Sequence, residues 1–339
     1  MRCDFEIVDE EEEIEDDESG GHLILALFGE QGSAKTSTSR RRRQLVDPCA
    51  APLQSGVPKD KGDVTALAAG RHVIGYNNLS YLPDWFSDLL CCVSDGMGDI
   101  KRSLFTNNDA FVFEGTRPVI FNGIPQVAKR PDLIDRAIII ALDSIMDGDR
   151  KLTRQLAKDW RAVWPRVLGA LLDLVSRGIR RLPTTTLKEK PRMADAALWA
   201  VACGDKAEND AGGIWGAGEF MTAYLRNRAA AVEVILASDT LVPPLRAFVA
   251  RNPAWKGTAE ELLLELNKAH NVATIGPDTS WPRSADALGS RLMRTSAPLR
   301  TTGLSIDWAR DSSGGREQRI ISFSYIAAAR REGEGEKPA

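Results

Sequence analysis

The feature that most constrains the fold is an apolar run that leads directly into a glycine-containing loop. Residues 23–28 are all apolar, as in a buried strand, and residues 29–36 read Gly-Glu-Gln-Gly-Ser-Ala-Lys-Thr. A strand that ends in such a loop, with a helix after it, points backbone N–H groups at phosphate oxygens. The pattern therefore predicts an α/β fold that binds a nucleoside triphosphate at the carboxyl end of this strand.

The loop carries the residue types that phosphate binding requires. Gly29 and Gly32 let the backbone curl around phosphate oxygens, and Lys35 is placed to reach the β and γ phosphates of ATP. The hydroxyl of Thr36 is the predicted ligand of Mg²⁺. The predicted nucleotide-binding residues are Gly29, Glu30, Gln31, Gly32, Ser33, Ala34, Lys35, Thr36 and Ser37.

One position departs from the usual motif, which has glycine immediately before the lysine. Here that residue is Ala34, whose β-carbon disfavours a left-handed backbone. We therefore expect a helical backbone at Ala34, with a helix that begins there. The competing interpretation is a glycine-containing turn with an incidental lysine, and the strand-like segment before the loop favours the phosphate-binding interpretation.

Composition limits the class of protein. The chain has 339 residues, 43% of them hydrophobic, which predicts two or three domains with hydrophobic cores. No apolar run approaches the roughly 20 residues that a membrane-spanning helix requires. The N-terminus is acidic, unlike a secretory signal, so we expect a cytoplasmic protein with no membrane partner. The five cysteines and three histidines match neither a disulfide framework nor a zinc site.

The charge is distributed unevenly along the chain. Residues 1–18 contain eleven acidic residues and one arginine, a net charge of −10. The chain as a whole has a net charge of −3, so the other 321 residues have a net charge of +7. A basic body with an acidic tail is one pattern of nucleic-acid proteins, and it makes DNA a candidate partner. We expect residues 1–20 to be a disordered tail, either a solubilising extension or an autoinhibitory mimic of DNA.

Short apolar strands alternate with helical segments over residues 21–148, as in a parallel sheet flanked by helices. The predicted strands are Leu23–Phe28, His72–Tyr76, Arg117–Phe121 and Ala137–Leu142. Residues 149–240 are predicted to be mostly helical. Apolar side chains at helical spacing are expected to form a core there: Leu152, Leu156, Trp160, Val163, Trp164, Val167, Leu168, Leu171 and Leu172.

The pattern changes again after residue 240. Thr258–Glu261 is a capping box before an apolar run, and a second helix is predicted to begin at Ser284. Alternating strands at 304–308 and 319–323 then flank a Gly-Gly turn. Helices followed by such a hairpin indicate a winged helix over residues 241–325, and residues 326–339 are predicted to form a flexible tail.

Two polar positions follow predicted strands where a nucleotide hydrolase needs catalytic groups. The second strand normally ends in an aspartate that holds the Mg²⁺ shell, but this chain has Asn77 and Asn78, whose amides lack the charge and proton affinity of a carboxylate. Asn122, at the end of the third strand, is placed to orient the attacking water or contact the γ-phosphate. Its alternative role is in an ordinary Asn-Gly turn.

Two arginines precede the last predicted strand. In a ring of subunits, Arg130 or Arg136 at this place reaches the γ-phosphate of a neighbouring subunit and stabilises transition-state charge. The competing role for either arginine is an ion pair with Asp132 or Asp135.

Candidates for DNA contact lie in the core and in the C-terminal part. Lys101 and Arg102 lie beside a hairpin predicted from Ser103–Phe105 and Phe111–Phe113.

The C-terminal candidates are Arg283, Arg291, Arg294 and Arg300. Arg291 and Arg294 are three residues apart and share a helical face that can meet single- or double-stranded DNA. The run Arg40–Arg43 spreads around a helix, so we expect it to be solvated surface.

Several segments together resemble one family. They are residues 27–36, 45–48, 78–80 with 85–91, 117–124 and 130–137. In combination they resemble ATP-binding proteins of phages and mobile elements that are related to the helicase half of replicative primase-helicases, of the AAA-type superfamily III kind. Residues 255–263 and 281–292 resemble the terminal winged-helix region of the same proteins.

The resemblance covers residues 22–325 and implies an ATP-driven DNA helicase or translocase that works as a homo-oligomeric ring, with a primase or replication partner. It implies that Lys35 and Thr36 bind phosphate and Mg²⁺, and that Lys101 and Arg102 lie in a DNA-contacting hairpin. It also gives each of two further residues a catalytic role: Asn122 as γ-phosphate sensor and Arg136 as trans-acting finger.

One departure from the family supports an alternative function. Relatives have Asp-Asn-Leu-Ser where residues 77–80 of this chain read Asn-Asn-Leu-Ser. The alternative is a nucleotide-binding DNA-binding protein with weak or lost ATP hydrolysis. A small-molecule phosphotransferase is a third class, and no acceptor-site motif in the chain supports it.

Overall fold

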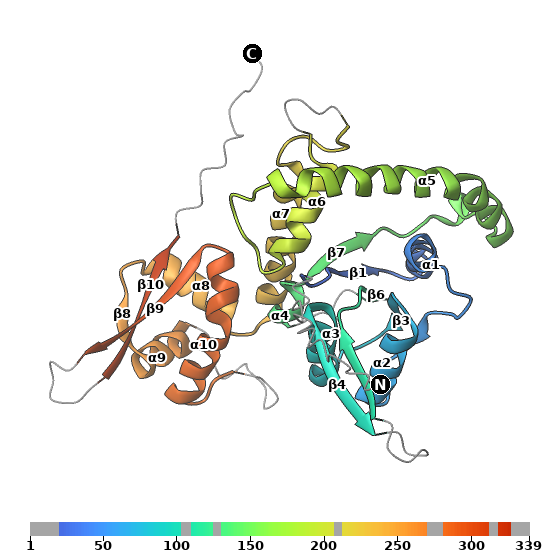
Figure 1. The fold of residues 1–339 in the computed structure, drawn as a ribbon. Helices are drawn as coiled ribbons and strands as arrows, with labels where there is room; N and C mark the ends of the chain where they lie inside the picture. Colours follow the sequence, from blue (N-terminus) through green and yellow to red (C-terminus); the bar gives the residue numbers. More distant parts are fainter. Residues whose placement is uncertain are drawn as a thin grey trace, which may run out of the picture.

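The computed structural model describes residues 20–102, 110–124, 130–206, 212–269, 281–311 and 318–326. The described elements form a sheet with flanking helices in the first half of the chain. A smaller group of helices and strands forms the C-terminal part, and long helices lie between the two (Figure 1).

A five-stranded parallel sheet organises the first half of the chain. Its strands lie in the order β2-β3-β6-β1-β7, so β1 (Ile24–Gly29) is an inner strand, between β6 (Val119–Gly123) and the edge strand β7 (Ala137–Leu142). β3 (Ile74–Leu79) lies beyond β6, and the short β2 (Gln54–Ser55) forms the edge. The predicted α/β class with a parallel sheet flanked by helices is confirmed.

Helices α1 (Lys35–Val46), α2 (Lys61–Gly70) and α3 (Asp84–Asp95) flank this sheet, and α4 (Pro131–Ile134) precedes β7. The Phe86 ring of α3 meets the Tyr76 ring of β3 edge-on, at 5.0 Å between centroids. Buried apolar residues of the strands and helices form one continuous core.

The middle strands continue past the ends predicted from sequence. β3 runs through Asn77 and Asn78 to Leu79, with an irregularity in its pairing between Tyr76 and Leu79. β6 likewise includes Asn122. The apolar pattern stops before these polar residues, but the side chains of Asn77 and Asn122 form hydrogen bonds and that of Asn78 is exposed. β2 was not predicted, because two exposed polar residues carry no strand signal.

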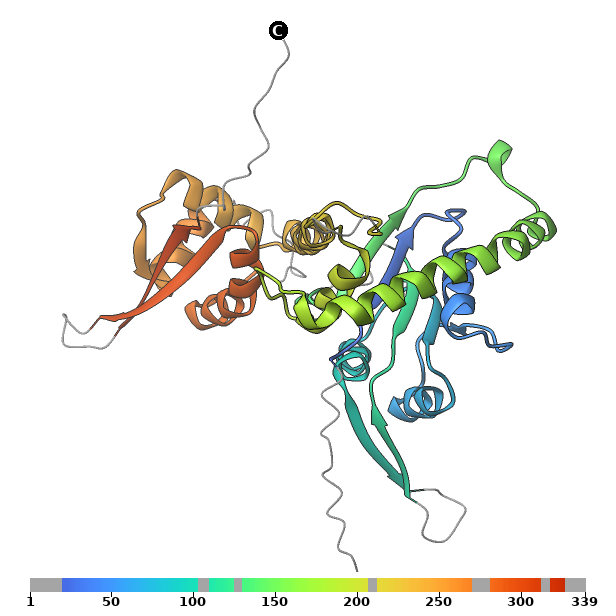
Figure 2. The ribbon, with the colours of Figure 1, turned by 45° about the horizontal axis from the view of Figure 1, so that its top comes forward.

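A two-stranded antiparallel hairpin extends away from the sheet (Figure 2). It pairs β4 (Met97–Arg102) with β5 (Ala110–Gly115). The expected first strand, residues 103–105, lies outside the described residues, and the observed one is the preceding segment. Lys101 is therefore on the strand itself, in register with Phe111, and Arg102 faces Ala110 in the register.

The helical region contains α5 (Thr153–Arg181), α6 (Ala194–Gly204) and α7 (Glu219–Ser238). Short 3-10 turns at Asp147–Asp149 and Leu182–Thr184 flank α5. The predicted helical content is confirmed.

The predicted core along α5 is wrong. Val163 and Leu172 are 43% and 59% exposed, and the only buried residues of the helix are Arg177 and Gly178 near its end. Gly178 is the place where α5 packs closely on α6, because a β-carbon there would lie 2.4 Å from the sulfur of Cys203. The first five turns of α5 keep helical periodicity but have no buried side chain, so periodicity alone predicted the helix and not its burial.

Helix α7 ties the helical region to the edge of the sheet. The side chain of Asn227 accepts a hydrogen bond from the Ile139 backbone N–H at 2.9 Å and donates one to the Ile139 carbonyl at 2.6 Å. An edge strand leaves such backbone groups open, and here one amide side chain satisfies both, as a neighbouring strand would. Arg228, the residue after Asn227, forms an ion pair with Asp135 at 2.5 Å.

The C-terminal elements form a three-stranded antiparallel sheet, in the order β8-β10-β9, packed with three helices. The predicted capping box is confirmed: Glu261 Oε2 accepts from the Thr258 N–H at 2.7 Å, and Thr258 Oγ1 accepts from the Glu261 N–H at 3.2 Å. Ser284 caps the last helix as predicted. The elements are α8 (Val242–Arg251), β8 (Lys256–Thr258), α9 (Ala259–Ala269), α10 (Ala285–Thr301), β9 (Leu304–Asp311) and β10 (Gln318–Tyr325).

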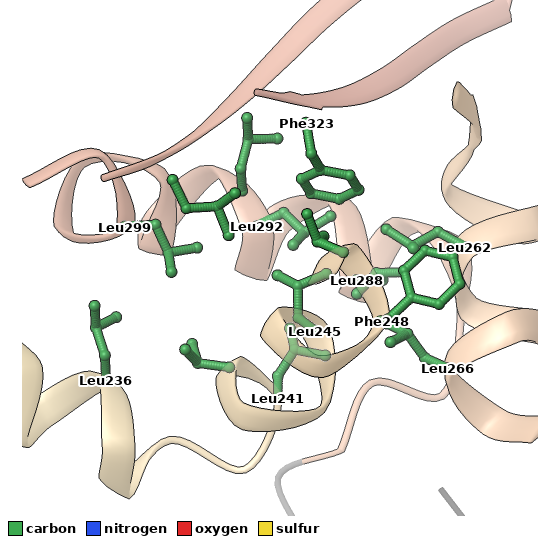
Figure 3. Packing of buried hydrophobic residues seen from close by; sticks show 14 of the residues in the cluster. Leu236, Leu241, Leu245, Phe248, Leu262, Leu266, Leu288, Leu292, Leu299 and Phe323 are labelled. Atoms are coloured by element: carbon green, nitrogen blue, oxygen red, sulfur yellow. The ribbon is translucent and has the colours of Figure 1, made fainter. Parts of the chain in front are cut away.

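Buried leucines and aromatic residues hold these elements together (Figure 3). Leu245, Leu262, Leu288 and Leu292 are fully buried in this cluster. Leu236, at the end of α7, belongs to the same cluster, so the helical region and the C-terminal elements share one core. None of the helices within the described ranges combines the length and apolarity needed to cross a membrane.

Candidate nucleotide-binding site

The predicted phosphate-binding loop lies at the carboxyl end of β1, an inner strand of the sheet (Figure 1). Gly32 has a φ of 86°, which residues with a β-carbon rarely adopt. Gly29 has a φ of 156°, and a β-carbon on it would lie 2.4 Å from the carbonyl oxygen of Leu142. The loop therefore requires glycine at Gly32 for the backbone conformation and at Gly29 for close contact with the neighbouring strand.

The backbone at Ala34 contradicts the helical conformation expected from the sequence. Its φ is 60° and its ψ is 18°, in the left-handed region, and α1 begins at the next residue, Lys35. A β-carbon in this conformation costs on the order of 1 kcal/mol. The loop thus keeps the backbone that glycine adopts, even though this chain has alanine there.

The first turn of α1 presents backbone N–H groups to the same place. No side chain caps this end of α1, and the first residues of a helix have N–H groups without intrahelical acceptors. These N–H groups and the positive end of the helix dipole favour an anion.

Lys35 folds over the loop. Its Nζ donates to the carbonyl oxygens of Gly29 at 2.7 Å and Glu30 at 2.6 Å, and to Ser33 Oγ at 3.3 Å. Phosphate oxygens carry full negative charge and form stronger, charge-assisted hydrogen bonds with an ammonium than carbonyl oxygens do. The ammonium is therefore held at the loop and is available to exchange its carbonyl partners for phosphate.

The predicted metal-binding hydroxyl and the second polar position are brought together. Thr36 Oγ1 donates to Asn77 Oδ1 at 2.6 Å, across 41 residues of sequence. The side chain of Asn78 is exposed, and the residue has a φ of 58°. Of the two asparagines at the end of β3, Asn77 is thus the one that faces the loop.

The donor set at this point fits Mg²⁺ only in part. Mg²⁺ prefers oxygen ligands and is usually bound through one or two carboxylates together with substrate phosphates. Thr36 and Asn77 supply neutral oxygens. Among the residues that the structure describes, no group of three or more His, Cys, Asp or Glu is arranged to hold a metal ion. Phosphate oxygens would have to supply the negative charge at this site.

Asn122 lies close to these residues, but its amide is already engaged. Its Oδ1 accepts from the Asn78 N–H at 3.0 Å, and its Nδ2 donates to Ser39 Oγ at 2.9 Å. The residue is 1% exposed and lies inside β6, so the alternative of an Asn-Gly turn is wrong. Its contacts join the ends of β3 and β6 to α1, and its contact with the γ-phosphate stays a prediction.

The two candidate arginine fingers have different surroundings. Arg136 has a side chain only 5% exposed and pairs with Asp95 at 2.6 Å and Asp132 at 2.7 Å. Burial alone would lower the pKa of Arg136, but its hydrogen bonds to both carboxylates raise it above the usual value, so the guanidinium stays charged. The structure thus shows Arg136 in ion pairs, which is the competing structural role, and its role as a trans-acting finger stays a prediction.

Arg130 is more accessible. Its side chain is 38% exposed and pairs with Asp88 at 2.8 Å and Asp84 at 3.6 Å on α3, whose carboxylates are themselves exposed. Exposed pairs of this kind are weak and exchange readily. Arg130 is therefore the candidate of the two that a neighbouring molecule can reach.

The paired arginines of α10 also differ. Arg291 pairs with Asp239 at 2.9 Å and has a side chain 17% exposed, so it ties α10 to the end of α7. Arg294 is exposed on α10. Both arginines were predicted to contact DNA. Arg291 is engaged with Asp239, whereas Arg294 does not take part in that ion pair.

Sequence reasoning missed two features beside the loop. The run Arg40–Arg43 was expected to be solvated, but Arg43 is buried and donates to the carbonyl oxygens of Ala51 and Pro52. Arg41 lies over the Trp160 ring at 5.7 Å and donates to the Leu156 carbonyl, which joins α1 to α5. Four consecutive arginines give no sequence signal for this, because each contact is set by elements distant in the chain.

Comparisons with known proteins identify the family. A family model described as "Actinomycete integrative conjugative element replication protein" matches residues 23–211, and one described as "AICE RepA C-terminal domain" matches residues 241–334. No curated protein sequence matches the chain. Among solved structures, a weak similarity is found to a DNA polymerase III gamma subunit-related protein from Thermotoga maritima, at 10% identity, covering 84% of this chain and 88% of that one with a TM-score of 0.24.

The left-handed backbone at Ala34 predicts that Ala34→Gly stabilises the protein. Glycine removes the β-carbon penalty, so the free energy of unfolding should rise by about 1 kcal/mol. The matched control is Ala66→Gly, at an exposed position inside α2, which should lower the same quantity by about 1 kcal/mol because glycine is a poor helix former. Urea unfolding of both variants measures the difference, and equal destabilisation by the two would contradict the assigned backbone.

Proposed function

Because the chain belongs to the actinomycete integrative conjugative element replication protein family, we propose that it binds ATP at the loop Gly29–Thr36 and acts on DNA in replication of such an element. The observation that carries the ATP site is the loop itself. It combines glycine-dependent backbone at Gly29 and Gly32 with Lys35 Nζ folded over it and an uncapped helix end beside it. These are the groups that hold a phosphate chain.

In the proposed complex, Lys35 leaves its carbonyl partners and pairs with the β and γ phosphates. Thr36 and Asn77 would hold Mg²⁺ together with phosphate oxygens, and the ion would neutralise charge on the phosphates. The Thr36–Asn77 hydrogen bond places both oxygens on one side of the loop. The chain would therefore contribute two oxygen ligands that are already close together.

We place this site in an AAA-type ATPase that moves along or unwinds DNA as a ring of subunits. The support is positional. Asn77 and Asn122 lie near the carboxyl ends of strands, on the same edge of the sheet as the loop. Arg130 lies partly exposed before β7, where a neighbouring subunit's ATP can meet it. The β4–β5 hairpin, with Lys101 and Arg102 on its first strand, is the proposed DNA-gripping element. A primase or other replication protein is the proposed partner.

The second candidate function is nucleotide-dependent DNA binding with weak or lost hydrolysis. One observation favours it: Asn77 occupies the position that faces Thr36, and it carries no negative charge. An amide holds Mg²⁺ less strongly than a carboxylate and does not serve as a base. Binding of ATP is compatible with this site even where turnover is slow.

For the C-terminal elements we propose a winged helix that contacts DNA. The support is the element order, with α8, β8, α9 and α10 followed by the β9–β10 hairpin in one antiparallel sheet. α10 is the proposed recognition helix, and Arg294 is exposed on it.

The Thr36–Asn77 contact predicts that Asn77→Asp raises ATP turnover. A carboxylate at this position adds charge that holds Mg²⁺, so we expect kcat for DNA-stimulated hydrolysis to rise on the order of tenfold, which corresponds to about 1.4 kcal/mol. Asn78→Asp, on the exposed neighbour, should change kcat little. Phosphate release with and without single-stranded DNA measures this, and no turnover in any variant, with ATP binding intact, would favour the non-hydrolysing alternative.

The two arginines of α10 should respond differently to removal. Arg294→Ala should weaken DNA binding and reduce the slope of log K against log salt by about 1, with unchanged thermal stability. Arg291→Ala should lower stability, because it removes the ion pair with Asp239 that ties α10 to the end of α7, and should leave the salt slope unchanged. Fluorescence anisotropy over a salt series and thermal unfolding separate the two. The reverse pattern would contradict the proposed DNA-binding face.

A further inference from the structure

The segment that follows β7 lies against the phosphate-binding loop. Ser144 Oγ donates to Glu30 Oε2 at 3.1 Å, and the Ile145 N–H donates to the Gly32 carbonyl at 3.4 Å. Through these contacts, residues more than a hundred positions later in the sequence lie against the loop. No sequence motif indicates this juxtaposition.

The same segment turns back and places Arg150 over Gly32. A β-carbon on Gly32 would lie 2.5 Å from Arg150 Nη2 and 3.4 Å from its Cζ. The guanidinium therefore occupies the space that any larger residue at position 32 would fill. Glycine at this position serves the backbone conformation and also admits the arginine.

Local contacts orient this arginine without burying it. Arg150 Nε donates to the Ile145 carbonyl at 3.3 Å, and Nη1 pairs with Asp147 at 3.2 Å. The Arg150 side chain is 52% exposed and that of Asp147 is 92% exposed. An ion pair this exposed contributes little, so exchange of Asp147 for a phosphate costs little. The guanidinium is thus held beside the loop and remains free to take a stronger partner.

We propose that Arg150 is a nucleotide-binding residue that contacts the phosphate chain from the segment after β7. The proposal rests on the ATP site proposed above and adds to Lys35 a second cation at the loop. A guanidinium offers a planar fork of N–H donors that matches two phosphate oxygens at once, which an ammonium does not. The ligand class is a nucleoside di- or triphosphate.

Acidic residues near the loop make a cation useful for phosphate binding. Asp143, Asp147 and Asp149 precede Arg150 in the sequence, and Glu30 lies on the loop itself. These carboxylates repel a polyphosphate. Arg150 offsets that repulsion at the point where the segment meets the loop.

The test measures nucleotide affinity of full-length variants by isothermal titration calorimetry with MgATP and MgADP. Arg150→Ala should weaken both affinities about tenfold, and Arg150→Lys should recover part of the loss because it keeps the charge without the fork. Asp147→Asn should tighten binding, since it removes a competing anion and releases the arginine. Arg166→Ala, at an exposed position on α5, is the matched control and should bind as the unaltered protein does.

Thermal unfolding of each variant checks that the fold is retained. Binding by Arg150→Ala within twofold of the unaltered protein would overturn the proposal while the ATP site stands. Weaker binding by Asp147→Asn than by the unaltered protein would also overturn it. Absence of nucleotide binding by the unaltered protein is a different result, because it would refute the ATP site itself.

Discussion

The parallel pairing of β1 with β6 and β7 is the constraint on which the site depends. Carboxyl ends of parallel strands lie at one edge of a sheet, so this pairing places the loop after β1 beside the ends of β3 and β6 and the segment after β7. Residues as far apart in sequence as Thr36 and Asn77, or Gly32 and Arg150, then meet within hydrogen-bond or contact distance. Without this order of strands, the loop would be a surface turn with no neighbours.

Much of this could be predicted from sequence, and for identifiable physical reasons. Buried strands and the loop carry local signals: apolar runs, glycines with special backbone, and a lysine followed by a hydroxyl residue. The capping box at Thr258 and the cap at Ser284 are equally local, since each involves residues three apart. Such features need no knowledge of the tertiary fold.

Most features that sequence reasoning missed depend on contacts between distant elements. Helical periodicity along α5 does not show that its buried residues, Arg177 and Gly178, lie near its end, where Gly178 packs on α6. Asn122 and Arg136 also have partners on other elements, Ser39 for the amide and Asp95 for the guanidinium, and their catalytic roles stay predictions. Ala34 was misjudged because residue type predicts the preferred backbone, whereas the loop imposes its own at a cost of roughly 1 kcal/mol.

Equilibrium dialysis of labelled MgATP measures whether the loop with Lys35 binds the phosphates of ATP. The unaltered protein should retain ATP, Lys35→Ala should lose it, and Lys61→Ala, at an exposed lysine on α2, should retain it. All three proteins should show the same thermal unfolding. Equal retention of ATP by the unaltered protein and Lys35→Ala, or no retention by either, would contradict the account.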